Sequence, residues 1–189
     1  MSSGESAAPA PRAAPAVRAR RWITRGAAET ERLGAELAPE LRPDGVLLLS
    51  GELGSGKTVL ARGLAGALGI DPRQVLSPTF NLIREHRGTA GSMVHVDLYR
   101  LEPEETAALG LDEVLAAGGV KVVEWAERLP APPPAASSPF SAAPSPPSPS
   151  SRPSPVVALR LRRLPEEGDE AREIVEELPP GIAPRELAE

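Results

Sequence analysis

One short stretch of this sequence has the residue types and spacing of a phosphate-binding loop. The pattern G-x-x-x-x-G-K-[ST] is filled by Gly51, Gly56, Lys57 and Thr58. Glycines let the backbone bend around phosphates, and the loop amides then face the anion with the positive end of the following helix. The Lys57 ammonium would neutralise phosphate charge, and the Thr58 hydroxyl would ligate Mg²⁺. We predict a nucleotide site formed by Glu52, Leu53, Gly54, Ser55, Gly56, Lys57 and Thr58.

Two acidic residues that follow apolar runs are candidates to complete this site. Asp97 comes directly after residues 93–96, and Glu124 comes directly after residues 120–123. A magnesium-nucleotide site needs carboxylates at strand ends, one to hold the metal and a second that can orient the attacking water. We therefore predict that Thr58, Asp97 and Glu124 form the metal site and leave open which carboxylate ligates directly. The alternative is that each acid is an ordinary surface residue.

The loop motif by itself leaves the reaction class open. A small-molecule kinase needs an acceptor pocket and an arginine-rich lid that closes over the nucleotide. Arg84 and Arg87 lie near a predicted hairpin tip, and Arg160, Arg162 and Arg163 lie on a strand predicted at the sheet edge. These positions weaken the kinase hypothesis without removing it.

The elements that must position these residues form an α/β pattern. The apolar run 46–49 lacks alternation, as expected for a central strand buried on both faces, and it leads directly into the glycine loop. We predict one P-loop NTPase-like mixed sheet flanked by helices. The predicted strands are 20–24, 46–49, 79–86, 93–98, 120–124, 156–161 and 172–178, and the predicted helices are 27–41, 57–68, 104–109 and 112–117. Two hairpins are expected, 79–86 with 93–98 and 156–161 with 172–178, the second at the sheet edge.

Three segments fall outside this pattern. Residues 1–19 are rich in Ala, Pro and Ser and are predicted to be a disordered tail, although they faintly resemble a transit peptide. Residues 130–155 are mostly Pro and Ser and are predicted to be a disordered insertion, with docking to an aromatic groove as the alternative. Residues 179–189 are assigned to a C-terminal tail. The single predicted domain thus spans residues 20–178.

Composition narrows the function classes further. The net charge of −5 argues against a protein that binds nucleic acid over a broad surface. The absence of cysteine excludes disulfides and thiolate metal sites and fits a cytoplasmic protein. The sequence contains no apolar run of about 18 residues, so we expect no membrane span.

Four segments together resemble one family more specifically than the glycine loop alone. They are residues 51–58 (GELGSGKT), 77–80 (SPTF), 95–100 (HVDLYR) and 123–128 (VEWAER). Their order and spacing are similar to those of the TsaE family, the bacterial ATPases of tRNA threonylcarbamoyladenosine biosynthesis. The resemblance covers about residues 22–129. It departs at Glu52, where the family usually has Asp, at Val59, where a second Thr is usual, and in the insertion and the tail.

The resemblance implies an ATPase that works with TsaB- and TsaD-like partner proteins, which transfer a threonylcarbamoyl group to the tRNA adenosine beside the anticodon. Hydrolysis would reset that complex, and the partners would hold most of the tRNA. The resemblance also implies that Thr79 senses the γ-phosphate and Mg²⁺ in a switch loop, and that Trp125 lies near the nucleotide. Tyr99 and Arg100 would face a partner or form an ordinary loop.

Overall fold

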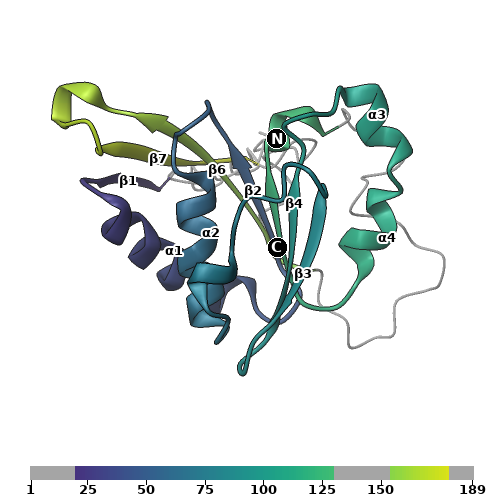
Figure 1. Ribbon diagram of the computed structural model, residues 1–189. Coiled ribbons are helices and arrows are strands. Elements are labelled where there is room, and N and C mark those ends of the chain that lie inside the picture. The colour runs from purple at the N-terminus through teal and green to yellow at the C-terminus, as the bar shows by residue number, and fades with distance from the viewer. Residues whose placement is uncertain (1–19, 130–153, 179–189) are drawn as a thin grey trace, which may run out of the picture.

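Short apolar runs form the middle of a seven-stranded sheet in this computed structural model (Figure 1). The structure describes residues 20–129 and 154–178. The predicted tails at 1–19 and 179–189 lie outside the described residues, as does the predicted insertion except for its last two residues. No helix in the described ranges is long and apolar enough to cross a membrane.

The sheet is mixed, as predicted, and its strand order is β1-β7-β6-β2-β5-β4-β3. Strands β6, β2, β5 and β4 run parallel in the centre, whereas β1, β7 and β3 are joined through antiparallel pairs. The strands are β1 (Arg21–Thr24), β2 (Val46–Ser50), β3 (Ile83–Arg87), β4 (Ser92–Asp97), β5 (Val120–Glu124), β6 (Val156–Arg163) and β7 (Arg172–Glu177).

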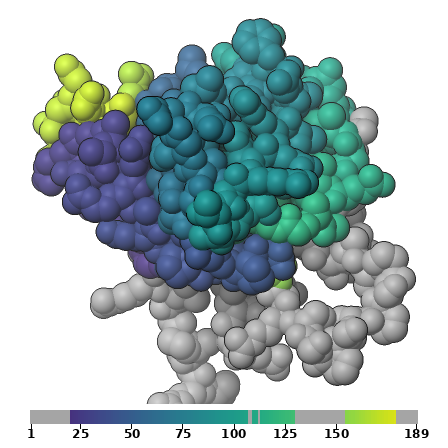
Figure 2. Space-filling model, turned by 60° about the horizontal axis from the view of Figure 1, so that its bottom comes forward, coloured from purple at the N-terminus to yellow at the C-terminus, as the bar shows by residue number. Residues whose placement is uncertain are grey.

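Both predicted hairpins are present, with two corrections. Strand β3 begins at Ile83 rather than at residue 79, because residues 76–82 form a loop that turns toward the carboxyl ends of the strands. The second hairpin does not lie at the sheet edge, since β6 is enclosed between β7 and β2, and β1 covers β7. The edge position predicted for Arg160, Arg162 and Arg163 is therefore wrong. In Figure 2 this C-terminal hairpin (yellow) lies against the N-terminal strand and helix (purple).

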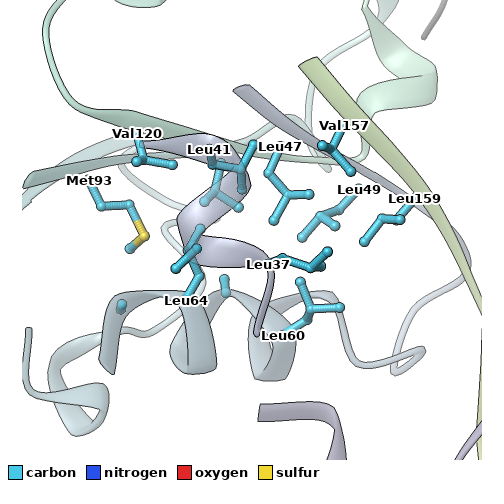
Figure 3. Packing of buried hydrophobic residues seen from close by; sticks show 14 of the residues in the cluster. Leu37, Leu41, Leu47, Leu49, Leu60, Leu64, Met93, Val120, Val157 and Leu159 are labelled. Atoms are coloured by element: carbon cyan, nitrogen blue, oxygen red, sulfur yellow. The ribbon is translucent and has the colours of Figure 1, made fainter. Parts of the chain in front are cut away.

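Helices cover the two faces of the sheet in pairs. Figure 1 shows α1 (Ala27–Leu41) and α2 (Lys57–Ala67) on one face and α3 (Pro103–Ala108) and α4 (Leu111–Ala116) on the other. Alternate residues of β2 serve the two faces. Leu47 and Leu49 pack into the α1/α2 core of Figure 3, whereas Leu48 belongs to the cluster that includes Leu111. Burial of both faces explains why β2 shows no alternation of polar and apolar residues.

Parallel pairing places the carboxyl ends of the central strands at one edge of the sheet. Asp97 at the end of β4 is in register with Glu124 at the end of β5, and Leu49 of β2 is the next partner of Glu124. The two predicted carboxylates thus lie side by side next to the loop that follows β2. Both residues are buried, with exposed fractions of 1% and 2%. Neither is the surface acid that the alternative reading proposed.

Candidate nucleotide-binding site

The glycine loop borders a cleft of about 400 Å³ at this edge of the sheet. Strand β2 ends at Ser50 and α2 begins at Lys57, so the loop joins a buried strand directly to a helix N-terminus. Gly51 and Gly56 have φ angles of 134° and 102°, which glycine adopts without strain. A Cβ on Gly51 would also lie 2.1 Å from the carbonyl oxygen of Leu161. The loop therefore requires glycine at these positions.

The Lys57 ammonium lies between loop carbonyls and an aromatic ring. Its Nζ donates hydrogen bonds to the carbonyl oxygens of Gly51 (2.6 Å) and Glu52 (2.9 Å) and lies 3.9 Å from the centroid of the Trp125 ring. Burial lowers the pKa of Lys57, and the nearby carboxylates, Glu124 first, oppose that change. A cation is thus held at the start of α2, where the helix dipole also favours an anion.

The Thr58 hydroxyl faces the first of the two carboxylates. Thr58 Oγ1 donates to Glu124 Oε2 at 3.0 Å, and the other carboxylate oxygen, Oε1, lies 2.8 Å from His95 Nε2. One hydroxyl and one carboxylate from neighbouring elements therefore meet beside the loop. Hydroxyl and carboxylate oxygens are ligands that Mg²⁺ prefers.

Asp97 holds the loop of residues 76–82. Its Oδ2 accepts hydrogen bonds from the hydroxyls of Ser77 and Thr79, the latter at 2.9 Å. Its Oδ1 accepts the backbone N–H of Tyr99 at 2.8 Å. Both loop hydroxyls are thereby fixed on the carboxylate that stands beside Glu124.

An aromatic pair borders the cleft beside Lys57. The ring centroids of Trp125 and Tyr99 are 4.9 Å apart, and both residues line the cleft. Trp125 has a φ of 61°, an uncommon value for a non-glycine residue, at the turn between β5 and the short 3₁₀ helix Ala126–Arg128. This turn directs the indole ring over Lys57.

Comparison with known proteins identifies the family. A family model described as "Threonylcarbamoyl adenosine biosynthesis protein TsaE" matches residues 24–142. This chain belongs to the TsaE family. It is 42% identical over 109 residues to the Bacillus subtilis tRNA threonylcarbamoyladenosine biosynthesis protein TsaE, a match that covers 58% of this chain and 68% of that protein. It is 43% identical over 111 residues to the TsaE of Mycobacterium leprae, covering 53% and 68%.

The chain also resembles a solved protein in its three-dimensional structure. The crystal structure of YdiB from Bacillus subtilis superposes with a TM-score of 0.57 and 30% identity, and the match covers 84% of each chain. The chain spans less than two thirds of some relatives, such as 64% of the Nostoc TsaE. The predicted recognition and fold class are confirmed, and the family functions in tRNA threonylcarbamoyladenosine biosynthesis.

Most of the residues predicted for the site lie around the cleft. The cleft lining includes Leu53, Gly54, Ser55, Gly56, Lys57, Thr58, Thr79, Asp97, Glu124 and Trp125. Glu52 differs, because its exposed carboxylate pairs with Arg163, which lowers the pKa of the Glu52 carboxyl group. Only the carbonyl of Glu52 faces Lys57. Within the described residues, no group of three or more His, Asp or Glu side chains could hold a metal ion by itself.

Sequence reasoning missed the residues that distant elements bring to this TsaE cleft. They include Ser77 beside Thr79, the α1 N-cap Gly26 with Ala27 and Thr30 of α1, Glu170 in the turn before β7, and Arg172, the first residue of β7. Ser77 could have been found from the sequence, since it belongs to the SPTF segment (residues 77–80) that resembles the family. Arg172 is more than 110 residues from the loop along the chain, and no sequence pattern links it to the site. Its position is decided by the pairing of β7 with β6 and β1.

Proposed function

We propose that this TsaE-family protein binds and hydrolyses ATP with Mg²⁺ in the cytoplasm. The proposal extends to tRNA threonylcarbamoylation carried out by TsaB- and TsaD-like partners, with this protein acting as an ATP-dependent switch on that complex. One observation carries the proposal: a phosphate-loop lysine, a hydroxyl, two buried carboxylates and a loop threonine meet at one cleft.

The described residues fit ATP and Mg²⁺ in separate roles. The loop amides and Lys57 would bind the phosphates, since they form a cationic end of the cleft at the start of α2. Thr58 and Glu124 would hold Mg²⁺, whose charge would stabilise the charge that develops on the phosphates. Asp97 would complete the metal site or orient the attacking water.

The loop of residues 76–82 would report the state of the nucleotide. Thr79 is fixed on Asp97, so any change in the ligands of this carboxylate is passed to the loop. Next to it, Phe80 is 83% exposed and stacks beneath the Arg100 guanidinium, 4.1 Å from the ring centroid. We assign this exposed pair, together with Tyr99, to the surface that faces the partners. A switch of this kind needs contacts that differ between nucleotide states.

The experiment is a multiple-turnover ATPase assay of the purified full chain with and without its TsaB- and TsaD-like proteins. We expect slow turnover by the isolated chain and faster turnover in the complex. Lys57→Ala should abolish ATP binding and turnover, because it removes the ammonium charge that would neutralise the phosphates. Arg163→Ala is the matched control, since it removes an exposed cation beside the loop that does not line the cleft.

Two results would contradict the proposal. Full ATPase activity of Lys57→Ala in the presence of partners would rule out the phosphate-loop assignment. Brisk turnover without partners, or transfer of the γ-phosphate to a small metabolite, would favour the small-molecule kinase. Of the arginines considered for a lid, Arg160, Arg162 and Arg163 pair with Glu177, Glu173 and Glu52 and do not line the cleft. Arg172 does line it, at the start of β7.

A further inference from the structure

Three buried polar side chains cross the sheet on the face that carries α2. Glu124 is on β5, His95 is on β4 and His86 is on β3. His95 pairs with Val122 and His86 pairs with Met93, so each side chain is the diagonal neighbour of the next on the same face. The row starts at the cleft and continues behind it, where the mechanism above assigns no role to the histidines.

The contact between His95 and Glu124 fixes which imidazole nitrogen carries the proton. Both carboxylate oxygens are engaged, Oε2 by the Thr58 hydroxyl at 3.0 Å and Oε1 by His95 Nε2 at 2.8 Å. An ionised carboxylate only accepts hydrogen bonds, so Nε2–H is the donor. His95 is fully buried, and its ring is therefore a rigid donor with one target.

An imidazole at position 95 costs stability that an apolar side chain of similar size would not. The Nδ1 atom of His95 is buried and has no hydrogen-bond partner among the described residues, and the same holds for Nε2 of His86. Buried polar atoms without partners reduce stability, and the neighbours on this face include the apolar Met93 and Val122. The two rings are neighbours, with centroids 6.3 Å apart, but neither of these two nitrogens has a partner on the other ring.

We propose that His95 is a positioning residue for the magnesium site. By donating from Nε2 to Glu124 Oε1, His95 holds the carboxylate so that Oε2 faces Thr58. This inference rests on the proposed function, in which Thr58 and Glu124 hold Mg²⁺. It adds that the orientation of Glu124 is set from behind the cleft, by a residue that touches neither nucleotide nor metal. Such supporting partners of a carboxylate ligand set its geometry and basicity.

The test compares nucleotide affinity with and without Mg²⁺, using calorimetric titration of the full chain with ADP. In wild type we expect Mg²⁺ to tighten binding relative to EDTA. His95→Leu should reduce that gain about tenfold, while the affinity in EDTA stays unchanged. His95→Gln keeps an N–H donor and should restore most of the gain. Met93→Leu alters a buried residue on the same strand and face, and it should leave the gain intact.

A second measurement reads the geometry without nucleotide or metal. Imidazole ¹⁵N NMR should show the Nε2–H tautomer for neutral His95, and Glu124→Ala should shift its resonances. An Nδ1–H tautomer would overturn the inference, and so would a Mg²⁺-dependent gain in affinity that is unchanged in His95→Leu. The inference also fails if Met93→Leu and His95→Gln lose as much of that gain as His95→Leu does. A wild-type chain that binds no nucleotide would overturn the proposed function itself. That failure is distinct, since a failure of the His95 role alone leaves wild-type binding normal.

Discussion

The contacts of Asp97 show how one side chain can join two functions. Its Oδ2 accepts the hydroxyls of Ser77 and Thr79, and its Oδ1 accepts the N–H of Tyr99, so the carboxylate organises the loop on one side and the turn after β4 on the other. A ligand that draws on Asp97 must compete with these hydrogen bonds. At the residue scale, the switch hypothesis therefore depends on Thr79.

We expect Thr79→Ala to reduce stimulation of ATP hydrolysis by the partners more than it reduces nucleotide affinity. One hydroxyl contributes about 0.5–1.5 kcal/mol, which is small among the many contacts of a triphosphate. The measurement is ATP affinity by titration alongside turnover with and without partners. Thr79→Ser keeps the hydroxyl and should behave like wild type. Equal losses of nucleotide affinity and of partner stimulation in Thr79→Ala would show that Thr79 contributes to nucleotide binding but not to the switch.

At the scale of elements, the position of the glycine loop depends on how closely α1 approaches α2. A Cβ on Gly63 of α2 would lie 1.7 Å from the Glu31 carbonyl oxygen, and a Cβ on Gly34 of α1 would lie 2.1 Å from the Leu60 carbonyl oxygen. Backbone therefore packs against backbone at this crossing. Since α2 begins at Lys57, a shift of α2 would move the phosphate site with it.

Gly63→Ala should destabilise the protein by about 1–3 kcal/mol or more, because the helices must separate to admit the methyl group. Gly66→Ala is the matched control in the same helix. Gly66 is exposed, and its added Cβ would lie 3.4 Å from Pro72 Cγ, so helix propensity should make it neutral or stabilising by up to about 1 kcal/mol. Chemical denaturation of both variants checks this. Equal stabilities would show that α1 and α2 are not in close contact.

The strands beside the cleft are linked by Glu173, which accepts hydrogen bonds from Arg162 and, at 2.5 Å, from Arg21. These two arginines, Arg162 first, lower the pKa of Glu173 below its ordinary value of 4.5. For a carboxyl group with a lowered pKa in the folded state, the stabilisation is complete above the unfolded pKa. It is lost as the pH falls through the folded pKa.

Glu173→Gln should therefore lower the melting temperature at pH 7 by a few degrees, and the difference from wild type should shrink once the pH falls below about 4.5. Thermal melts over a pH series measure this. Glu177→Gln is the control, because the pair of Glu177 with Arg160 is exposed and should contribute little. A difference for Glu173→Gln that persists unchanged at pH 3 would contradict the assignment.

At the scale of the whole molecule, the connection from β5 to β6 must return across the sheet. Both strands are parallel to β2 and lie on opposite sides of it. The helix Ala126–Arg128 stands beside the glycine loop, where Glu127 accepts the Gly51 N–H, whereas Pro155 accepts the N–H of Val46 at the start of β2. Parallel strands require a crossover of about a dozen residues or more. The segment between them is thus constrained in length, whatever its composition.

Complete deletion of residues 132–154 should prevent normal folding. From Arg128 to Val156 only five Cα steps would remain, with a reach of about 18 Å. The straight line from the end of β5 at Glu124 to Val156 is about 14 Å, three residues along the strands and two strand spacings across, and it runs through β2, so the chain needs a longer path around that strand. Replacement by a Gly/Ser linker of about 12 residues should preserve stability, since loop length changes closure entropy only slowly. Thermal melts of both variants decide. A normally folded full deletion would contradict this topology, and loss of partner binding with the linker would identify a docking element.

The sequence by itself determined the local features of this protein. Strand β2 and the glycine loop follow from a continuous apolar run and from glycine spacing, and α2 follows from its place directly after that loop, all visible within about 25 residues. The same holds for β5 and for the hairpin of β3 and β4, since a short turn fixes which strands pair. Asp97 and Glu124 could be predicted because each follows an apolar run. The four TsaE-like segments were enough to indicate the family.

Only the tertiary structure decided how these local features meet. Strand order placed Asp97 beside Glu124, enclosed β6 inside the sheet, brought Arg172 to the cleft and required a crossover after Arg128. It also turned the Glu52 carboxylate toward Arg163 and set His95 behind Glu124. The physical reason is that an apolar pattern states that a strand is buried but not which strand lies next to it. Pairing between distant segments depends on the packing of the whole chain.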